Sequence, residues 1–287
     1  MTSIVIPAHN EARVLGRLLD SLLADDFGDD TDIVVVCNGC TDDTARVAAA
    51  RGPRVRVVEI PVPSKHAALR AGDDHARGFP RLYVDADVVL TAADVRALTT
   101  PLDDGADRSD GTARILATAP RRHIPLAACA WPVRAYYRVW QRLPAVREGL
   151  FGRGVIALSK AGHDRIAALP PLMADDLAAS LAFAAHERRV VGAARVVVHP
   201  PRTWRDLIKR RVRAAVSTAQ VERQGPQGAS ARTGRSDLTA LLRAEPSLLP
   251  GVVVFVAAAL VARRGARKAI RAGDFGTWLR DESSRRN

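Results

Sequence analysis

Short apolar runs alternate with amphipathic segments along the first hundred residues of the chain. Four apolar runs predict buried strands, at residues 4–6, 33–36, 55–60 and 82–84. Over residues 14–23, leucines and valines recur every three or four positions, the spacing of a helix with one buried face. Three residues typical of helix N-caps precede the intervening segments: Asn10, Thr41 and Ser64. Strands that are apolar on both faces and separated by helices favour an α/β fold, with helices on either side of a mostly parallel sheet.

The middle of the chain shows weaker periodicity. Further strands are expected at 113–119, 155–158 and 190–198, and helices at 125–143 and 174–188. Ser159 is a candidate N-cap for the helix after residue 158. A strongly basic helix is expected over 203–223. The Gly-rich polar segments 103–112 and 224–236 predict loops. Closure of the segment 103–112, or of the region 203–236, would exclude water from a reaction site.

The most apolar segment comprises residues 248–262 and is flanked by Arg263 and Arg264. It is shorter than the roughly 20 residues of a simple membrane span, and Pro250-Gly251 interrupts it. Two interpretations remain open. One is a buried helix, and the other is an interfacial helix on the inner membrane face, with its arginines on lipid phosphates.

Length and charge narrow the class of protein. With 287 residues, 47% of them hydrophobic, the chain can form one large α/β domain with a small appendage. A net charge of +12 favours polyanionic partners, namely nucleotide phosphates, nucleic acid or an anionic membrane. The three cysteines, of which Cys37 and Cys40 form a C-x-x-C, show no second pair at zinc-like spacing, and reduced thiols are expected. A strand begins at once without a signal peptide, so we expect a cytoplasmic protein, peripheral on the inner membrane face if 248–262 is interfacial.

Two carboxylates follow the apolar run 82–84, in the tetrapeptide Val84-Asp85-Ala86-Asp87. In open α/β sheets, ligands bind at the carboxyl ends of the strands. Carboxylate oxygens there suit a hard divalent cation that keeps some waters and bridges to substrate phosphates. We therefore expect Mg²⁺ or Mn²⁺ with a nucleotide diphosphate, against the alternative of a solvated strand end.

Polar, turn-forming residues follow each of the first four predicted strands, and in a parallel sheet they lie side by side. In order, the motifs are Ile6-Pro7-Ala8-His9-Asn10-Glu11, Cys37-Asn38-Gly39-Cys40-Thr41-Asp42-Asp43-Thr44, Ser64-Lys65-His66-Ala67-Ala68-Leu69-Arg70-Ala71-Gly72 and Asp85-Ala86-Asp87. This ordered set resembles that of the family 2 (GT-A fold) inverting glycosyltransferases, over roughly residues 1–215. The resemblance implies a nucleotide-diphosphate sugar as donor, a divalent metal, and a glycan, a lipid or a small molecule as acceptor.

The resemblance also implies roles for single residues in donor binding. Four residues of the first turn resemble one wall of the nucleotide pocket: Pro7, Ala8, Asn10 and Glu11. Asn38 stands where the family contacts the base, and Lys65 where a point charge reaches the diphosphate. Asp85 is similar to the carboxylate that touches ribose or metal, Ala86 accompanies it, and Asp87 is similar to the direct metal ligand. The metal would neutralise the diphosphate as it leaves.

One position departs from the family pattern. Where the family commonly has an Asp that accepts a hydrogen bond from uracil, this chain has Cys37. A thiol is a poor acceptor, which puts uridine selectivity in doubt, although the neighbouring Asn38 is able to pair with an imide.

On the acceptor side, Ala174-Asp175-Asp176-Leu177 resembles the family's Glu-Asp pair. The resemblance implies that Asp176 is the general base for the acceptor hydroxyl and that Asp175 raises its pKa by like-charge proximity. The alternative is a helix N-terminus that favours acidic residues. Gly152-Arg153-Gly154 either lines the acceptor cleft or forms an ordinary turn into a strand.

Three basic residues further along have two interpretations each. His199 follows a predicted strand and is either a metal ligand or structural. Arg210 and Arg213 stand where the family often carries an Arg-rich motif that closes over the diphosphate. A solvated or lipid-facing basic surface is the alternative for both arginines.

The sequence is therefore interpreted as a metal-dependent inverting glycosyltransferase of the GT-A fold, with a basic helical C-terminal extension. The transferase domain is expected over 1–215, with a nucleotide-sugar-binding half, 1–100, and an acceptor-side half, 101–215, before the extension 216–287. A sugar-phosphate nucleotidyltransferase is the enzymatic alternative, although such enzymes usually open with a Gly-rich phosphate loop. A non-catalytic protein that binds nucleic acid or membrane would explain the charge but not the acidic pairs, and no nucleic acid is expected as a partner.

Overall fold

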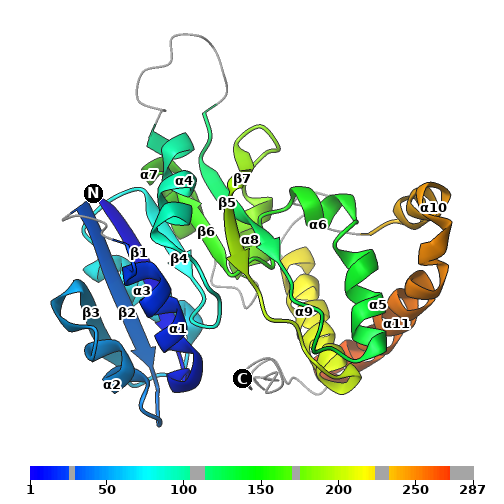
Figure 1. Ribbon diagram of the computed structural model, residues 1–287, viewed down its shortest axis with the longest axis horizontal. Helices are drawn as coiled ribbons and strands as arrows, with labels where there is room; N and C mark the ends of the chain where they lie inside the picture. The colour runs from blue at the N-terminus through cyan, green and yellow to red at the C-terminus, as the bar shows by residue number, and fades with distance from the viewer. Residues whose placement is uncertain (26–29, 104–113, 170–174, 224–232, 272–287) are drawn as a thin grey trace. The chain divides into compact units, whose positions relative to one another are not determined.

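The computed structural model describes residues 1–25, 30–103, 114–169, 175–223 and 233–271 (Figure 1). The chain forms two compact units that alternate along the sequence. The first, the sheet unit, comprises Met1–His123, Leu150–Pro171 and Ala182–Val198. The second, the helical unit, comprises Ile124–Gly149, Leu172–Leu181 and His199–Asn287. The domain boundary at residue 215 stays a prediction.

A seven-stranded sheet with the strand order β3-β2-β1-β4-β6-β5-β7 organises the sheet unit (Figure 1). Its strands are β1 (Thr2–Ala8), β2 (Thr31–Asn38), β3 (Val55–Ile60), β4 (Arg81–Val84), β5 (Ala117–His123), β6 (Val155–Leu158) and β7 (Arg188–Val197). The pairs β1–β2, β1–β4, β2–β3 and β5–β7 are parallel, whereas β6 runs antiparallel to β4 and β5. The mostly parallel α/β fold predicted from the sequence is confirmed.

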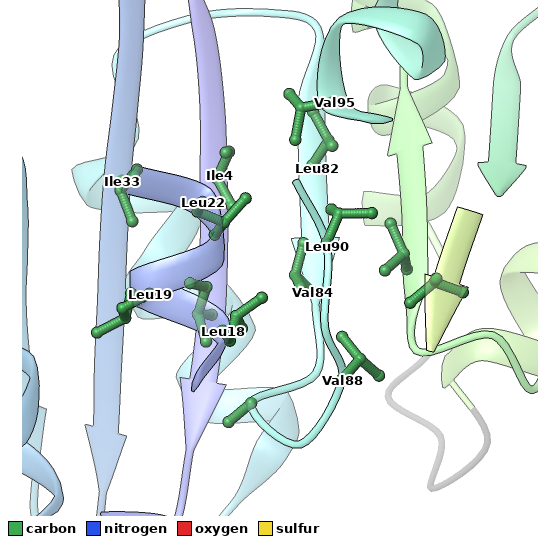
Figure 2. Close-up of a cluster of buried hydrophobic side chains, with 14 of the residues drawn as sticks. Ile4, Leu18, Leu19, Leu22, Ile33, Leu82, Val84, Val88, Leu90 and Val95 are labelled. Atoms are coloured by element: carbon green, nitrogen blue, oxygen red, sulfur yellow. The ribbon is translucent and has the colours of Figure 1, made fainter. Parts of the chain in front are cut away.

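Helices cover both faces of this sheet. One face carries α1 (Ala12–Leu23), α2 (Thr44–Ala49) and α4 (Ala92–Asp103). Figure 2 shows leucines of α1 beside Ile4 of β1 and Ile33 of β2, with Leu82 and Val84 of β4 in the same cluster. The other face carries α3 (Lys65–His75) and α7 (Lys160–Ala167). Both faces are apolar because each is buried under helices.

Two of the four predicted N-caps are confirmed, and two are wrong. The Ser64 and Ser159 hydroxyls accept from backbone N–H groups in the first turns of α3 and α7. Asn10 and Thr41 lie outside helices, whose N-caps are Glu11 for α1 and Asp43 for α2. The physical reason is that Asn10 adopts a left-handed φ of 52° and its side chain joins two loops instead.

Several elements of the middle segment differ from the predicted bounds. The helix expected over 125–143 is α5 (Trp131–Trp140), since Pro132 fits only the first turn of a helix. It is followed by the short α6 (Pro144–Glu148). The helix expected over 174–188 is α8 (Asp175–Leu181), and residues 188–189 already belong to β7. β5 ends at His123, four residues later than expected, because its partner β7 continues that far.

The helical unit also contains α9 (Trp204–Arg223), α10 (Arg235–Ala244) and α11 (Leu249–Arg271). The basic helix α9 was predicted, whereas α10 takes up the end of an expected loop. Pro250-Gly251 does not interrupt α11, because Pro250 occupies the first turn, where its missing N–H is no loss. Residues 246–271 are, in the described chain, the one helical segment long and apolar enough to cross a membrane. The loops expected at 103–112 and 224–236 fall largely outside the described residues.

Candidate functional site

The carboxyl ends of β1, β2, β3 and β4 meet at one edge of the sheet. The register places Ala8 beside Cys37, and Asn38 beside Ile60, at the ends of their strands. The four sequence motifs follow these strands, so the parallel topology brings all four to this edge, as expected. The first residue of β6, Val155, pairs with Val84 and lies at the same edge.

Side-chain hydrogen bonds join the turns after β1 and β2. Asn38 Nδ2 donates to the Ala8 carbonyl oxygen at 2.8 Å, and the Thr41 N–H donates to Asn10 Oδ1 at 2.7 Å. The Glu11 N–H donates to Thr44 Oγ1 at 2.8 Å. These three hydrogen bonds hold the turn after β1 and the turn after β2 together as one unit.

This network uses groups that were predicted to bind the nucleotide. Asn38 is 3% exposed, and its amide nitrogen already bonds to the chain. Pro7 and Ala8 belong to β1, and Glu11 is buried at the start of α1. The predicted contacts of these residues with a nucleotide stay predictions.

Gly39 allows the turn after β2 to approach the segment before α3 closely. Gly39 has a left-handed φ of 57° and its N–H donates to the Ile60 carbonyl oxygen at 2.7 Å. A Cβ added to Gly39 would lie 2.8 Å from the Pro63 nitrogen. This turn therefore packs directly against the segment that leads into α3.

Lys65 and Asp85 form an ion pair at the centre of the edge. Lys65 is the first residue of α3, and its Nζ lies 2.8 Å from Asp85 Oδ1. The side chains are 30% and 41% exposed, respectively. Asp87 is half-buried, and Ala86 between the two carboxylates is buried. The structure thus brings together the predicted phosphate-binding cation and the first of the two predicted acidic residues.

The segment before β6 supports the acidic pair from the other side. The Asp85 N–H donates to the Gly154 carbonyl oxygen at 2.7 Å. Gly154 has a left-handed φ of 67°, and a Cβ there would lie 2.5 Å from Val88 Cγ1 and 3.2 Å from Asp85 Oδ2. Only glycine fits this approach without strain.

Arg153 lies inside the sheet unit beside that glycine. It is 2% exposed, and its Nη1 donates to the Pro120 carbonyl oxygen of β5 at 2.9 Å. Burial lowers the pKa of Arg153 to about 10, so its guanidinium is still charged at neutral pH. This buried guanidinium connects the segment before β6 to the middle of β5.

The sequence analysis missed a group of basic residues at the end of β5. Arg121 and His123 are exposed, and Arg122 is half-buried. All three follow the part of β5 that pairs with β6. The signal was the run Arg-Arg-His after an apolar strand. It went unused because the predicted strand ended before it.

The thiols of Cys37, near the end of β2, and of Cys40, in the turn that follows, form no disulfide in the described chain. Burial, reinforced by the neighbouring Cys40 and Glu59, raises the pKa of Cys37 to about 12. Cys37 is therefore a neutral thiol at the position where the family commonly has a carboxylate.

Other predicted residues lie in the helical unit. Asp175 and Asp176 begin α8, and their side chains are outside the described part of the structure. Arg210 Nη1 donates to the His199 carbonyl oxygen at 3.4 Å, and Arg213 is half-buried one turn later on α9. Their roles in the base, metal and donor sites stay predictions.

The carboxylate oxygens at this edge fit a divalent cation whose remaining ligands come from the substrate. Within the described ranges, no group of three or more His, Cys, Asp or Glu side chains is arranged to hold a metal. Asp85 and Asp87 are two carboxylates, and the Lys65 ammonium already occupies an oxygen of one of them. Mg²⁺ and Mn²⁺ commonly use one or two carboxylates together with substrate phosphates.

Sequence comparison gives the family. Residues 3–144 match the model of Glycosyl transferase family 2. The undecaprenyl-phosphate 4-deoxy-4-formamido-L-arabinose transferase of Shewanella sediminis is 35% identical over 119 residues, which are 39% of this chain and 36% of that protein. An uncharacterised glycosyltransferase of Mycobacterium tuberculosis is 37% identical over 130 residues, 45% of this chain and 52% of that protein. The matched residues span between a quarter and about a half of the length of the curated relatives that the chain matches.

Solved structures share the fold. A mannosyltransferase of Pyrobaculum calidifontis, in complex with GDP-Man and Mn²⁺, has a TM-score of 0.60 at 22% identity, covering 97% of this chain and 84% of that one. Glucosyl-3-phosphoglycerate synthase from Mycobacterium tuberculosis, in complex with Mn²⁺, UDP-glucose and phosphoglyceric acid, has a TM-score of 0.55 at 21% identity, covering 77% and 79%. Both the sheet and the ordered turn motifs agree with the family match: residues 3–144 belong to glycosyl transferase family 2, and the chain has the GT-A fold.

Proposed function

We propose that this protein transfers a sugar from a nucleotide-diphosphate donor to an acceptor hydroxyl, with inversion at the anomeric carbon. The observation that carries the proposal is the Lys65–Asp85 pair, 2.8 Å apart, between the turns that end β1, β2 and β4. A cation and a carboxylate at the carboxyl edge of a parallel sheet suit a diphosphate and its metal. The family match and the nucleotide-sugar complexes of related folds support this assignment.

We assign the donor site to the sheet unit. Asp85 and Asp87 would hold Mn²⁺ or Mg²⁺, which when bound supplies Lewis-acid stabilisation of the departing diphosphate. Lys65 would exchange its bond to Asp85 for one to a diphosphate oxygen as the donor enters. The joined turns after β1 and β2 would orient the nucleoside, and the thiol of Cys37 would offer the base a weak donor rather than a carboxylate.

We assign the acceptor side to residues of the helical unit. Asp176 would accept the proton of the acceptor hydroxyl as its oxygen forms the bond to the anomeric carbon and the diphosphate leaves. General-base assistance of this kind contributes about 10²–10⁴-fold in rate. Asp175 would raise the pKa of Asp176, His199 would approach the metal, and Arg210 and Arg213 would contact the diphosphate.

A second candidate acceptor is a phosphate monoester. It is favoured by the basic group at the end of β5, Arg121 and Arg122, beside the buried Arg153. The Shewanella relative is named for an undecaprenyl-phosphate acceptor. A phosphate oxygen is ionised at neutral pH and would attack the anomeric carbon without losing a proton first, so this reaction needs no general base.

The first experiment is a thermal shift with a panel of nucleotide diphosphates and diphospho-sugars, with and without Mn²⁺. A metal-dependent rise in Tm with one nucleotide is expected, and it should disappear with EDTA and in Asp87→Ala. A folded protein that shows no shift with any nucleotide would refute the donor site.

The acceptor class is tested with Asp176→Asn once the donor is known. With a hydroxyl acceptor, kcat should fall about 10²–10⁴-fold while the donor-induced Tm shift persists. With a phosphate acceptor, kcat should stay within a few fold, and Arg121→Ala should raise the acceptor KM instead.

A further inference from the structure

The outward face of α11 carries a continuous apolar stripe. Leu249, Val253, Val256 and Leu260 follow each other at intervals of four, three and four residues, which places them on one side of the helix. They are 56%, 61%, 38% and 56% exposed, and the adjoining Val261 is 46% exposed. Large aliphatic side chains in contiguous exposed positions mark an interaction surface rather than ordinary surface composition.

The opposite side of α11 is firmly packed within the helical unit. Phe255 stacks on Tyr136 of α5 with ring centroids 5.2 Å apart. A Cβ added at Gly251 would lie 3.0 Å from Val139 of α5, and one at Gly265 would lie 2.6 Å from Val212 of α9. The helix therefore has one face fixed to its neighbours. Only 33% of its most apolar 18-residue stretch is buried.

The same outward surface becomes cationic towards the end of the helix. Five exposed basic residues occupy its last three turns: Arg263, Arg264, Arg267, Lys268 and Arg271. No Asp or Glu occurs in residues 249–271. An apolar stripe that continues into a basic cluster complements a surface whose apolar layer lies beneath anionic groups, which is the arrangement of an anionic lipid leaflet.

Charge and packing distinguish this occupant from two others. A second copy packed in parallel over the whole face would bring two basic clusters together, and one packed antiparallel would set each basic cluster against an apolar stripe. In neither case does the helix offer an acidic partner. A membrane-spanning α11 would bring α9 with it, since Gly265 and Val212 are in close contact, and α9 carries Arg210 and Arg211 near that position. Burying those charges in hydrocarbon is unfavourable.

We propose that the outward face of α11, the apolar residues together with the basic cluster, docks the protein in the plane of an anionic lipid bilayer without crossing it. The proposal is independent of the transfer chemistry, because donor binding can be measured in the absence of lipid. It would bring the enzyme to acceptors that reside in a membrane.

The test is flotation of the full-length protein with two kinds of vesicle, phosphatidylcholine alone and phosphatidylcholine mixed with phosphatidylglycerol. The wild type should float with the mixed vesicles, and raising the salt concentration should weaken that binding. Alkaline carbonate should release the protein. A wild type that stays unbound at low salt, or that resists carbonate extraction, would overturn in-plane docking.

Two variants locate the contact on α11. Val253→Glu with Leu260→Glu should lower the vesicle partition coefficient at least tenfold, and so should Arg264→Glu with Arg267→Glu. All four residues are exposed, so the variants should fold as the wild type does.

A matched control separates local from overall charge. Arg13→Glu with Arg96→Glu makes the same charge change at exposed positions of α1 and α4, and should alter partitioning less than threefold. Equal losses in the control and in the arginine pair of α11 would reduce the effect to net charge and refute the proposal. A dimer that Val253→Glu dissociates, without any vesicle binding by the wild type, would assign the face to a second copy instead.

Discussion

Replacing Lys65 with Met separates the structural role of this residue from its proposed role in binding the donor. In the free protein Lys65 bonds to Asp85, whose side chain is 41% exposed. Because water solvates such a carboxylate, the pair contributes less than about 1 kcal/mol to the free energy of unfolding. A hydrogen bond from Lys65 to a charged diphosphate oxygen contributes about 1.5–3 kcal/mol. Lys65→Met should therefore weaken donor binding roughly 10- to 150-fold and barely change stability.

Lys160 provides a closely matched control for this variant. It too is the first residue of a helix that a serine caps, and its Nζ lies 3.0 Å from Asp164. β6, which leads into that helix, is antiparallel to β4, so Lys160 lies at the opposite edge of the sheet from Lys65. Lys160→Met should cost as little stability and leave donor affinity unchanged.

The measurements are urea unfolding and calorimetric titration of a nucleotide diphosphate in the presence of Mn²⁺. Donor Kd values within threefold of one another in the two variants would refute the diphosphate contact. A loss of 3 kcal/mol or more of stability in Lys65→Met alone would show instead that the pair holds the fold together.

Two further predictions concern stability around the same edge. Gly154→Ala should destabilise by about 1–2 kcal/mol in urea unfolding and reduce donor binding, because of its left-handed φ and the approach to Val88. Gly192→Ala, where an added Cβ meets nothing within 4 Å, should be near neutral, and equal costs would contradict the argument. The pKa of Cys37 is about 12 in the folded protein and about 9 in the unfolded chain. The contribution of this buried thiol to the free energy of unfolding is therefore complete below pH 9 and is lost as the pH rises above it. From pH 7.5 to 10 the wild type should lose about 1.4 kcal/mol more than Cys37→Ala, and parallel losses would refute a buried neutral thiol.

Most of the nucleotide-binding half could be predicted from the sequence because its signals are local. The strand β3 has the predicted bounds, and Ser64 caps α3 as its position before a helical segment indicated. Asn10 is instructive as a failure. A residue of this type caps helices or adopts left-handed turns, and the choice depended on Thr41, which lies thirty-one positions away in the chain.

The acceptor side was harder to predict because its pairings are distant. Arg188 reads as the end of a helix until its pairing with β5 is known, and the same pairing extends β5 through Arg121–His123. The basic residues at that strand end, and the contact of Gly154 with Asp85, depend on β6 lying between β4 and β5. Strand order of this kind is set by contacts far apart in sequence, which local periodicity does not encode.

The position of β6 also limits how the protein can be divided. The family match ends at residue 144, yet β6, at Val155–Leu158, separates β4 from β5 in the sheet. A fragment that stopped at residue 144 would leave β4 with a bare edge of unpaired N–H and C=O groups, prone to join another chain. It would also lose the Gly154 carbonyl that holds the Asp85 N–H. The smallest piece able to carry the acidic pair in its native setting must therefore extend at least through β6, which ends at Leu158.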